Sequence, residues 1–418
     1  MNKSFIVALI LVAAAGLFAQ TPSNDSERPR VVVSNSMPPV QAAGIPAAKP
    51  VPSVTPASPS RPLTQPATDQ TSNASNLSYK GLSFSQLKNR IAEAKRQMQT
   101  RPLMTAMSEP LSLSTPVHIA YYDWNDQKVE YVVLSKEAFL TPNYPTTVLS
   151  SNGKPMTSRT IRANGVNTPV VLTDSNGQPH LPILVQYPVE RGGRYYETAY
   201  YMSTHPGLVT PETVAAGRFY VRNVIDIARE RLKTKGLPIQ PAIADIAERL
   251  ATVEHVDHLR FRTEYHPNIY NDIFTLFALN EGQTYRYSVS SAGAGGMVQM
   301  IPSTYRIVRA RYPHAGLMPD FVEGMRDHIN AGQAMLLYMQ MTWDDLISRP
   351  TITNALQTRI ATQEQLMSAG YNSNPAKLAG YINRGGAGWT TLIPRETQIY
   401  LRIYESLERA VTLDPRKQ

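Results

Sequence analysis

The chain has 418 residues, of which 42% are hydrophobic, so it is long enough for two domains with sizeable cores and an extension. It contains no cysteine, which excludes a disulfide framework, a thiolate metal site and a cysteine nucleophile. Its formal net charge of +9 favours anionic partners, such as nucleic acid, lipid headgroups or acidic cell-wall polymers, although charges scattered along the chain also serve solubility.

Residues 1–19 have the pattern of a secretion signal. Lys3 supplies the positive start, Phe5–Phe18 is an apolar run, and Ala19 is a small residue suited to the cleavage point. The run is shorter than the roughly 20 residues of a spanning helix, so we expect cleavage, with an uncleaved anchor as the alternative. The mature chain should then have no transmembrane domain. We expect an exported protein of the periplasm or cell envelope, or a secreted one, for which nucleic acid is not a partner.

Residues 20–78 are dominated by proline, serine, alanine and threonine, and they contain no aromatic residue. Such a segment cannot bury enough apolar area to offset its conformational entropy, which predicts a disordered tether. An amphipathic helix is predicted next, ending near Gln99. Ser83 and Gln86 have the spacing of a capping box at its start.

The helix is expected to open a β-rich accessory domain that extends over residues 79–210. Val117–Tyr122 and Val129–Leu134 are rich in β-branched and aromatic residues, which predicts strands. Asn-Gly pairs at 152–153 and 176–177 are typical of hairpin turns. This segment contains no recognisable chemical motif. Two roles stay open for it: contact with another protein of the cell envelope, or coverage of the groove of the following domain.

From Pro211 the pattern becomes helical, and Thr210 before it makes a typical helix start. The predicted helices span 211–234, 240–262, 267–281, 302–311, 325–346, 353–369, 374–383 and 394–413. Together they predict an all-α domain over residues 211–413. The predicted fold class is therefore α+β, with the β-rich accessory domain preceding the helical one.

Glu281 is predicted at the end of a helix, in line with the apolar face of that helix. Tyr270, Phe274 and Phe277 precede Glu281 by eleven, seven and four residues, which puts all four on one side of a helix. A carboxyl group at the end of a core-facing stripe is partly buried and meets the negative end of the helix dipole. Both effects favour the protonated form that a general acid needs near neutral pH. A solvated glutamate at a frayed helix end is the alternative.

Glu281 is followed at fixed offsets by small and polar residues, namely Ser290, Gly293, Ala294, Gly296 and Gln299. Three motifs come later in the chain: His-Ile-Asn-Ala-Gly at 328–332, Tyr-Asn at 371–372 and Glu-Thr-Gln-Ile-Tyr at 396–400. Taken in order, the four resemble the signature of the lytic transglycosylases with a goose-lysozyme-like catalytic domain, the soluble lytic transglycosylase type. The resemblance covers roughly residues 265–410.

The resemblance implies a lysozyme-like fold for the helical domain and cleavage of peptidoglycan glycan strands without a metal or cofactor. Glu281 would protonate the oxygen between N-acetylmuramic acid and N-acetylglucosamine. Its carboxylate would then take the proton of the muramyl 6-hydroxyl, which closes onto C1 and leaves a 1,6-anhydro product. One protein carboxylate suffices in this scheme, whereas ordinary glycosidases use two.

The other site residues follow from the same resemblance. Ser290 and Gln299 would contact the sugars, while Tyr371 and Tyr400 would line the pocket and fix Glu281. The supporting residues would be Gly293, Gly296, Asn372, which would hold the loop carrying Tyr371, and Glu396, which would open the last helix and cap its amides.

Two further groups of residues have a functional and a structural interpretation. Tyr305, Tyr338 and Trp389 are candidates for stacking on sugar rings, although aromatic residues at helical spacing also occupy cores. Glu254, His255, Asp257 and His258 suggest a metal site, but the histidines are three residues apart and not the four of a zinc-protease helix. For these four we expect a solvated helix face.

The chain departs from the family pattern at Gly282, Val298, His328 and Gly370. Two alternative functions therefore stay open. One is a goose-type lysozyme, which would add water to the same bond. The other is a peptidoglycan-binding scaffold without activity, which the departures at Gly282 and Val298 favour.

Overall fold

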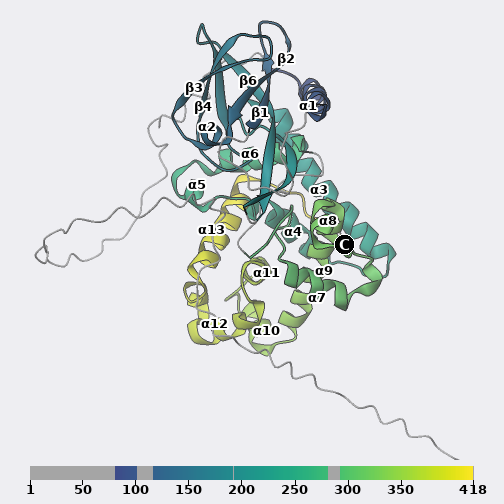
Figure 1. The fold of residues 1–418 in the computed structure, drawn as a ribbon. Helices are drawn as coiled ribbons and strands as arrows, with labels where there is room; N and C mark the ends of the chain where they lie inside the picture. Colours follow the sequence, from purple (N-terminus) through teal and green to yellow (C-terminus); the bar gives the residue numbers. More distant parts are fainter. Residues whose placement is uncertain (1–80, 101–115, 192, 281–291, 418) are drawn as a thin grey trace, which may run out of the picture.

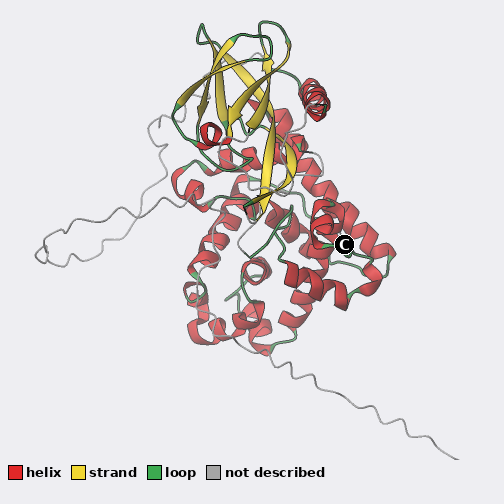
Figure 2. Ribbon diagram, viewed as in Figure 1, coloured by secondary structure: helices red, strands yellow, loops and turns green. Residues whose placement is uncertain are grey.

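The computed structural model describes residues 81–100, 116–191, 193–280 and 292–417. The protein is mixed α+β, with the strands gathered at one end of the molecule and most helices at the other (Figures 1 and 2). The predicted signal and tether lie outside the described residues. Within the described ranges, no helix is long and apolar enough to cross a membrane.

Seven antiparallel strands form one curled sheet, in the order β2-β1-β6-β5-β4-β3, with β7 pairing the long β6. The strand predictions at Val117–Tyr122 and Val129–Leu134 are confirmed, and both Asn-Gly pairs connect paired strands. The strands are β1 (Pro116–Asp123), β2 (Lys128–Ser135), β3 (Pro145–Leu149), β4 (Pro155–Thr160), β5 (Val170–Asp174), β6 (Pro179–Arg191) and β7 (Arg194–Met202).

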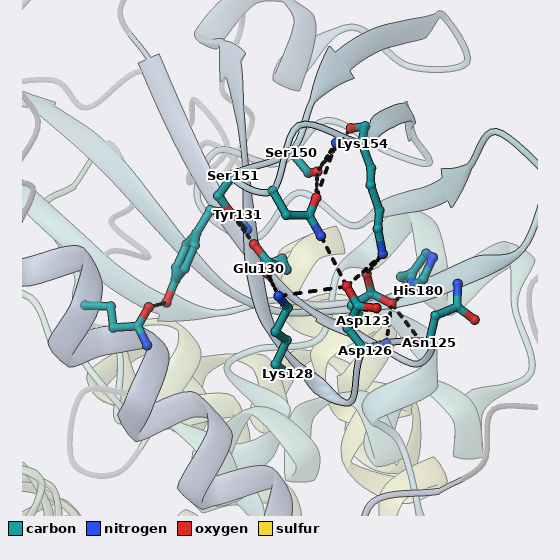
Figure 3. A network of polar contacts seen from close by, with 12 residues as sticks. Asp123, Asn125, Asp126, Lys128, Glu130, Tyr131, Ser150, Ser151, Lys154 and His180 are labelled. Carbon is teal, nitrogen blue, oxygen red and sulfur yellow. Dashed lines mark hydrogen bonds and ion pairs between the residues drawn. The ribbon is translucent and has the colours of Figure 1, made fainter.

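Polar contacts draw the two ends of the curled sheet together (Figure 3). The backbone N–H of Tyr131 on β2 donates to Ser151 Oγ beyond β3 at 2.9 Å. Lys154 Nζ lies 3.3 Å from Asp123 Oδ2 and 2.7 Å from Asp126 Oδ2, which joins the β1–β2 turn to the β3–β4 turn. Burial opposes ionisation of Asp123, but hydrogen bonds from the turn backbone and the nearby cations hold the pKa of its carboxyl group below the usual value.

The helix α1 (Phe84–Gln99) covers one face of the sheet. Its capping box of Ser83 and Gln86 is present as predicted. Gln186 on β6 donates to Met98 O at 3.2 Å, so polar contact adds to the apolar packing. The N–H of Phe84 also donates to a carboxylate oxygen of Glu212 at 2.8 Å, which ties α1 to the first helix of the following segment.

Helices dominate the rest of the chain. The buried centre is formed by α3, α4, α6 and α9: α3 packs on the other three, α4 packs on α6 and α9, and the last helix, α13, packs on α4 and α6. The helices are α2 (Lys136–Leu140), α3 (Pro211–Thr234), α4 (Pro241–Val253), α5 (His258–Thr263), α6 (His266–Leu279), α7 (Pro302–Arg311), α8 (Phe321–Arg326), α9 (His328–Ile347), α10 (Pro350–Gln357), α11 (Gln363–Asn372), α12 (Leu378–Gly385) and α13 (Arg395–Ala410), with short 3₁₀ turns η2 (Pro206–Leu208), η3 (Pro313–Ala315), η4 (Pro375–Lys377) and η5 (Gly386–Thr391).

The predictions for 211–234 and 302–311 agree with α3 and α7, but three longer predictions are wrong. The segments predicted at 240–262, 325–346 and 353–369 each divide into two helices, which restart after Asp257, Asp327 and Thr362. Each of these three side chains accepts a hydrogen bond from a backbone N–H of the new helix. Local capping therefore overrides the continuous apolar periodicity.

The sheet and the helices meet at a polar junction. The N–H of Met202, at the end of β7, donates to Asn280 Oδ1 at 2.8 Å. Glu197 on the same strand lies 3.6 Å from Arg326 of α8. A cavity beside this joint is lined from both parts by Arg162, His205, His255, Arg260 and Asp272, among others. The end of β7 is thus fastened to the end of α6.

Candidate functional site

The helix α6 has the buried face predicted for it. Tyr270, Phe274 and Phe277 are all buried, and the helix ends at Leu279 with Asn280 as its C-cap. The side chain of Asn280 accepts a hydrogen bond from the backbone of β7, and this bond fixes the point where the chain leaves α6 against the sheet. Glu281 is the next residue. It lies outside the described residues, as does Ser290.

The chain after this segment forms a tight turn that requires glycine. Gly293 and Gly296 have φ values of +76° and +73°, which residues with a side chain rarely adopt. A Cβ atom on Gly296 would also lie 2.7 Å from Met325 O of α8. Gln299 has a φ of 45°, and its side-chain amide donates to Gly296 O at 2.9 Å. The two supporting glycines therefore shape the turn that carries Gln299.

Two side chains from distant parts of the chain hold this turn. The Tyr371 hydroxyl of α11 donates to Val298 O at 2.6 Å. His255, just after α4, lies with Nε2 2.9 Å from Met297 O. Because a carbonyl only accepts, Nε2 carries the ring proton. Burial lowers the pKa of His255 to about 3, so the ring is neutral and keeps this bond across the physiological range.

Tyr400 has a partner that was not expected from the sequence. Its hydroxyl donates to Glu254 Oε1 at 2.6 Å, and the tyrosine is buried on α13. Glu254 and His255 were expected on a solvated helix face, and this is wrong for both. Because α4 ends at Val253, the two side chains leave the helix and bond to other elements. Glu254 is therefore a carboxylate of the site region that sequence reasoning missed.

Asn372 and Glu396 lie where α11 and α13 meet. Thr397 donates its hydroxyl proton to Asn372 Oδ1 at 2.8 Å in a buried contact. We expected Asn372 in a loop with Tyr371, but α11 continues through both residues, so Asn372 joins two helices. Glu396 is in the first turn of α13, where a carboxylate suits the helix dipole. The helix begins after Pro394, without a side-chain cap at that position.

Two of the three candidate stacking residues are core residues. Tyr305 is 1% exposed, and its hydroxyl donates to Met318 O at 2.8 Å. Trp389 is completely buried, and its indole N–H donates to Ile360 O at 3.2 Å. Both positions exclude stacking on a bound sugar. Tyr338 is half-buried and packs edge-on against Tyr371, with 5.8 Å between the ring centroids.

Together these contacts form one connected set, which we call the turn clamp: His255, Met297, Val298 and Tyr371, with Glu254 and Tyr400 joined to it through the peptide bond between Glu254 and His255. His255 of the clamp also packs edge-on against Phe277 in the last turn of α6, with 5.8 Å between the ring centroids, so the turn that carries Gln299 is held near the end of this helix. No family model, curated protein or solved structure matches this chain.

Proposed function

We propose that the protein is an exported lytic transglycosylase that cleaves the β-1,4 bond between N-acetylmuramic acid and N-acetylglucosamine in peptidoglycan. In this proposal the Glu281 carboxyl group protonates the glycosidic oxygen. The muramyl 6-hydroxyl oxygen bonds to C1, and the Glu281 carboxylate takes its proton. The products are a free 4-hydroxyl on N-acetylglucosamine and a 1,6-anhydro end, and no water is consumed.

The observation that carries the proposal is the turn clamp. It connects residues of three separate motifs, at 293–299, 371–372 and 396–400, which are far apart in the chain. In the proposed enzyme these motifs surround one sugar-binding groove. Direct hydrogen bonds also link the motifs in series, from Val298 to Tyr371 and from Asn372 to Thr397.

Location and charge are compatible with this substrate. Residues 1–19 have the pattern of an export signal, and peptidoglycan lies outside the cytoplasm. The formal net charge of +9 favours association with an anionic cell-wall polymer. In the same proposal the curled sheet is an accessory part that contacts another protein of the envelope.

The test is a digest of purified peptidoglycan followed by mass spectrometry of the products. Wild-type protein should release muropeptides with 1,6-anhydro ends. Glu281→Gln keeps the shape of the side chain and removes its proton transfer, so release should fall at least about 10²-fold while binding to sacculi remains. Glu408→Gln is the matched control, because Glu408 is a half-exposed carboxylate on α13 whose ion pair with Arg249 is long, at 3.8 Å.

One observation favours hydrolysis as a second candidate. Glu254 adds a second carboxylate to the site region, and ordinary glycosidases use two. A goose-type lysozyme would produce reducing ends and no anhydro form, so the same digest separates the two reactions. Retention on sacculi without any release would instead indicate a peptidoglycan-binding scaffold.

A further inference from the structure

Two stretches of the helical part contain cations and no carboxylate. Residues 231–244 and 292–319 together hold six lysines and arginines, and neither stretch contains an aspartate or a glutamate. The stretches meet in space, because Lys235 at the end of α3 donates from Nζ to the carbonyl oxygen of Ala315 in η3, just after α7 (Figure 1). Their positive charge is therefore gathered where the end of α3 lies beside the segment that follows α7.

The cations at this place form what we call the basic face: Arg231, Lys235, Arg306, Arg309 and Arg311. Arg306 and Arg311 are exposed, and the described part of the chain offers neither of them a hydrogen bond or an ion pair. Of the carboxylates next to the two stretches, Asp245 pairs with Arg416 and Asp320 caps α8, which leaves Glu230. The basic face therefore keeps most of its positive charge uncompensated.

An exposed apolar side chain lies among these cations. Ile307 of α7 is 56% exposed, and Arg311 lies four residues further along, on the same side of the helix. Arg306 flanks the isoleucine, and the small residues Ser303 and Ala310 complete the solvent-facing side of α7. A soluble anion gains nothing from an exposed isoleucine. A lipid bilayer, by contrast, takes up an apolar side chain and also offers phosphates to the cations around it.

We propose that the basic face docks the protein on the surface of a lipid bilayer that carries anionic phosphate headgroups. The guanidinium groups pair with headgroup phosphates, for which their fork of N–H donors is suited, and Ile307 enters the boundary between headgroups and acyl chains. The helix α7 then lies along the surface, with buried Tyr305 and Val308 toward the protein core. This attachment does not depend on the proposed cleavage of peptidoglycan.

The test measures how the full-length chain partitions onto sedimented vesicles. One set of vesicles contains equal parts of phosphatidylglycerol and phosphatidylcholine, and the other contains phosphatidylcholine alone. The ratio of the two partition coefficients isolates the contribution of anionic headgroups. The apolar run Phe5–Phe18 is present in every variant, so its contribution cancels when variants are compared. For the wild type the ratio should be well above one and should fall as salt screens the exposed charges.

Two pairs of substitutions locate the binding surface. Arg306→Gln combined with Arg311→Gln should lower the ratio about 25-fold, because each Lys or Arg near an anionic bilayer contributes about fivefold. Arg402→Gln combined with Arg409→Gln is the matched control. It removes the same charge from two exposed arginines of α13, which lie three and four residues from Glu405. The control should stay near the wild-type ratio, and both pairs should keep wild-type thermal unfolding.

Ile307→Ser separates a bilayer from a soluble anionic polymer. On vesicles with phosphatidylglycerol this change should lower the partition coefficient about fivefold, because less apolar area enters the membrane. Binding to soluble polyphosphate should be the same as for the wild type. If Ile307→Ser leaves vesicle binding unchanged while the Arg306 and Arg311 pair loses polyphosphate binding, the partner is a soluble polymer and the proposal is wrong.

Two other results would overturn the proposal. Equal losses in the two arginine pairs would show a response to net charge and not to the basic face. An unchanged ratio in the Arg306 and Arg311 pair would show that this face does not meet the membrane. A loss confined to that pair, together with weaker vesicle binding of Ile307→Ser, supports the proposal whatever the peptidoglycan digest yields.

Discussion

Replacing Gly296 by alanine should destabilise the protein more than the same change at Gly293, although both have a positive φ. The left-handed conformation costs a residue with a side chain about 1–2 kcal/mol. At Gly296 the new Cβ also meets Met325, with its carbonyl oxygen at 2.7 Å and its own Cβ at 3.0 Å. Overpacking of this kind costs about 1–3 kcal/mol. The sum is about 2–5 kcal/mol for Gly296→Ala.

Gly293→Ala is the matched control for this change. Its φ of +76° is almost the same, but the nearest atom to the added Cβ is Pro302 Cγ at 3.6 Å, which is an ordinary contact. Only the conformational cost of about 1–2 kcal/mol should remain. The difference between the two variants therefore reports the close approach of the turn to α8.

Equilibrium urea unfolding, followed by the fluorescence of the three tryptophans, measures both free energies of unfolding. Release of muropeptides should fall in Gly296→Ala even where the protein remains folded, because Gln299 rests on the carbonyl of Gly296. Equal destabilisation in the two variants would refute the reasoning. It would mean that α8 moves to make room for the added Cβ atom and that the turn is not packed tightly against it.

Three further changes have expected outcomes. In Gly217→Ala the added Cβ would lie 1.8 Å from the backbone oxygen of Phe274, so α3 and α6 must separate, and urea unfolding should show a loss of at least about 3 kcal/mol. Tyr371→Phe leaves the buried carbonyl of Val298 without its donor, which should cost about 1–3 kcal/mol in the same assay and lower kcat. Burial lowers the pKa of His205 to about 4, so its neutral form contributes stability above the unfolded pKa near 6.5, and up to about 3 kcal/mol is lost as the pH falls toward 4. His205→Asn should abolish that loss in urea titrations at each pH, and an unchanged pH dependence would contradict this assignment.

Local signals in the sequence were sufficient for much of the fold. The capping box at Ser83 predicted the start of α1, and Thr210 with Pro211 predicted the start of α3. The helix breaks were missed because apolar periodicity continues across them while one side chain, such as Asp257, caps a new helix. Periodicity reports which face is buried, and it does not report where the backbone leaves the helix.

The candidate site was harder to predict from the sequence, for a related reason. Motif spacing selected Gln299, Tyr371 and Tyr400, but it carried no information about partners outside the motifs. Glu254 and Tyr400 are 146 residues apart, and no local pattern marks a contact at that separation. Asp257 was the one available signal, because an aspartate at this position can cap the start of a new helix. A new helix there requires the previous one to end earlier, so Glu254 and His255 would not have been assigned to its solvated face.

The joint between Met202 and Asn280 has a consequence for dividing the protein. A cut between the strands and α3 would remove the N–H that holds the residue just before Glu281, and it would also remove the carboxylate of Glu212 from the start of α1. Each fragment would lose a hydrogen bond that it makes with the other. We therefore expect the sheet and the helices to melt together in a single calorimetric transition, and the helical fragment made alone to lose the geometry at the end of α6 before it loses its helix content.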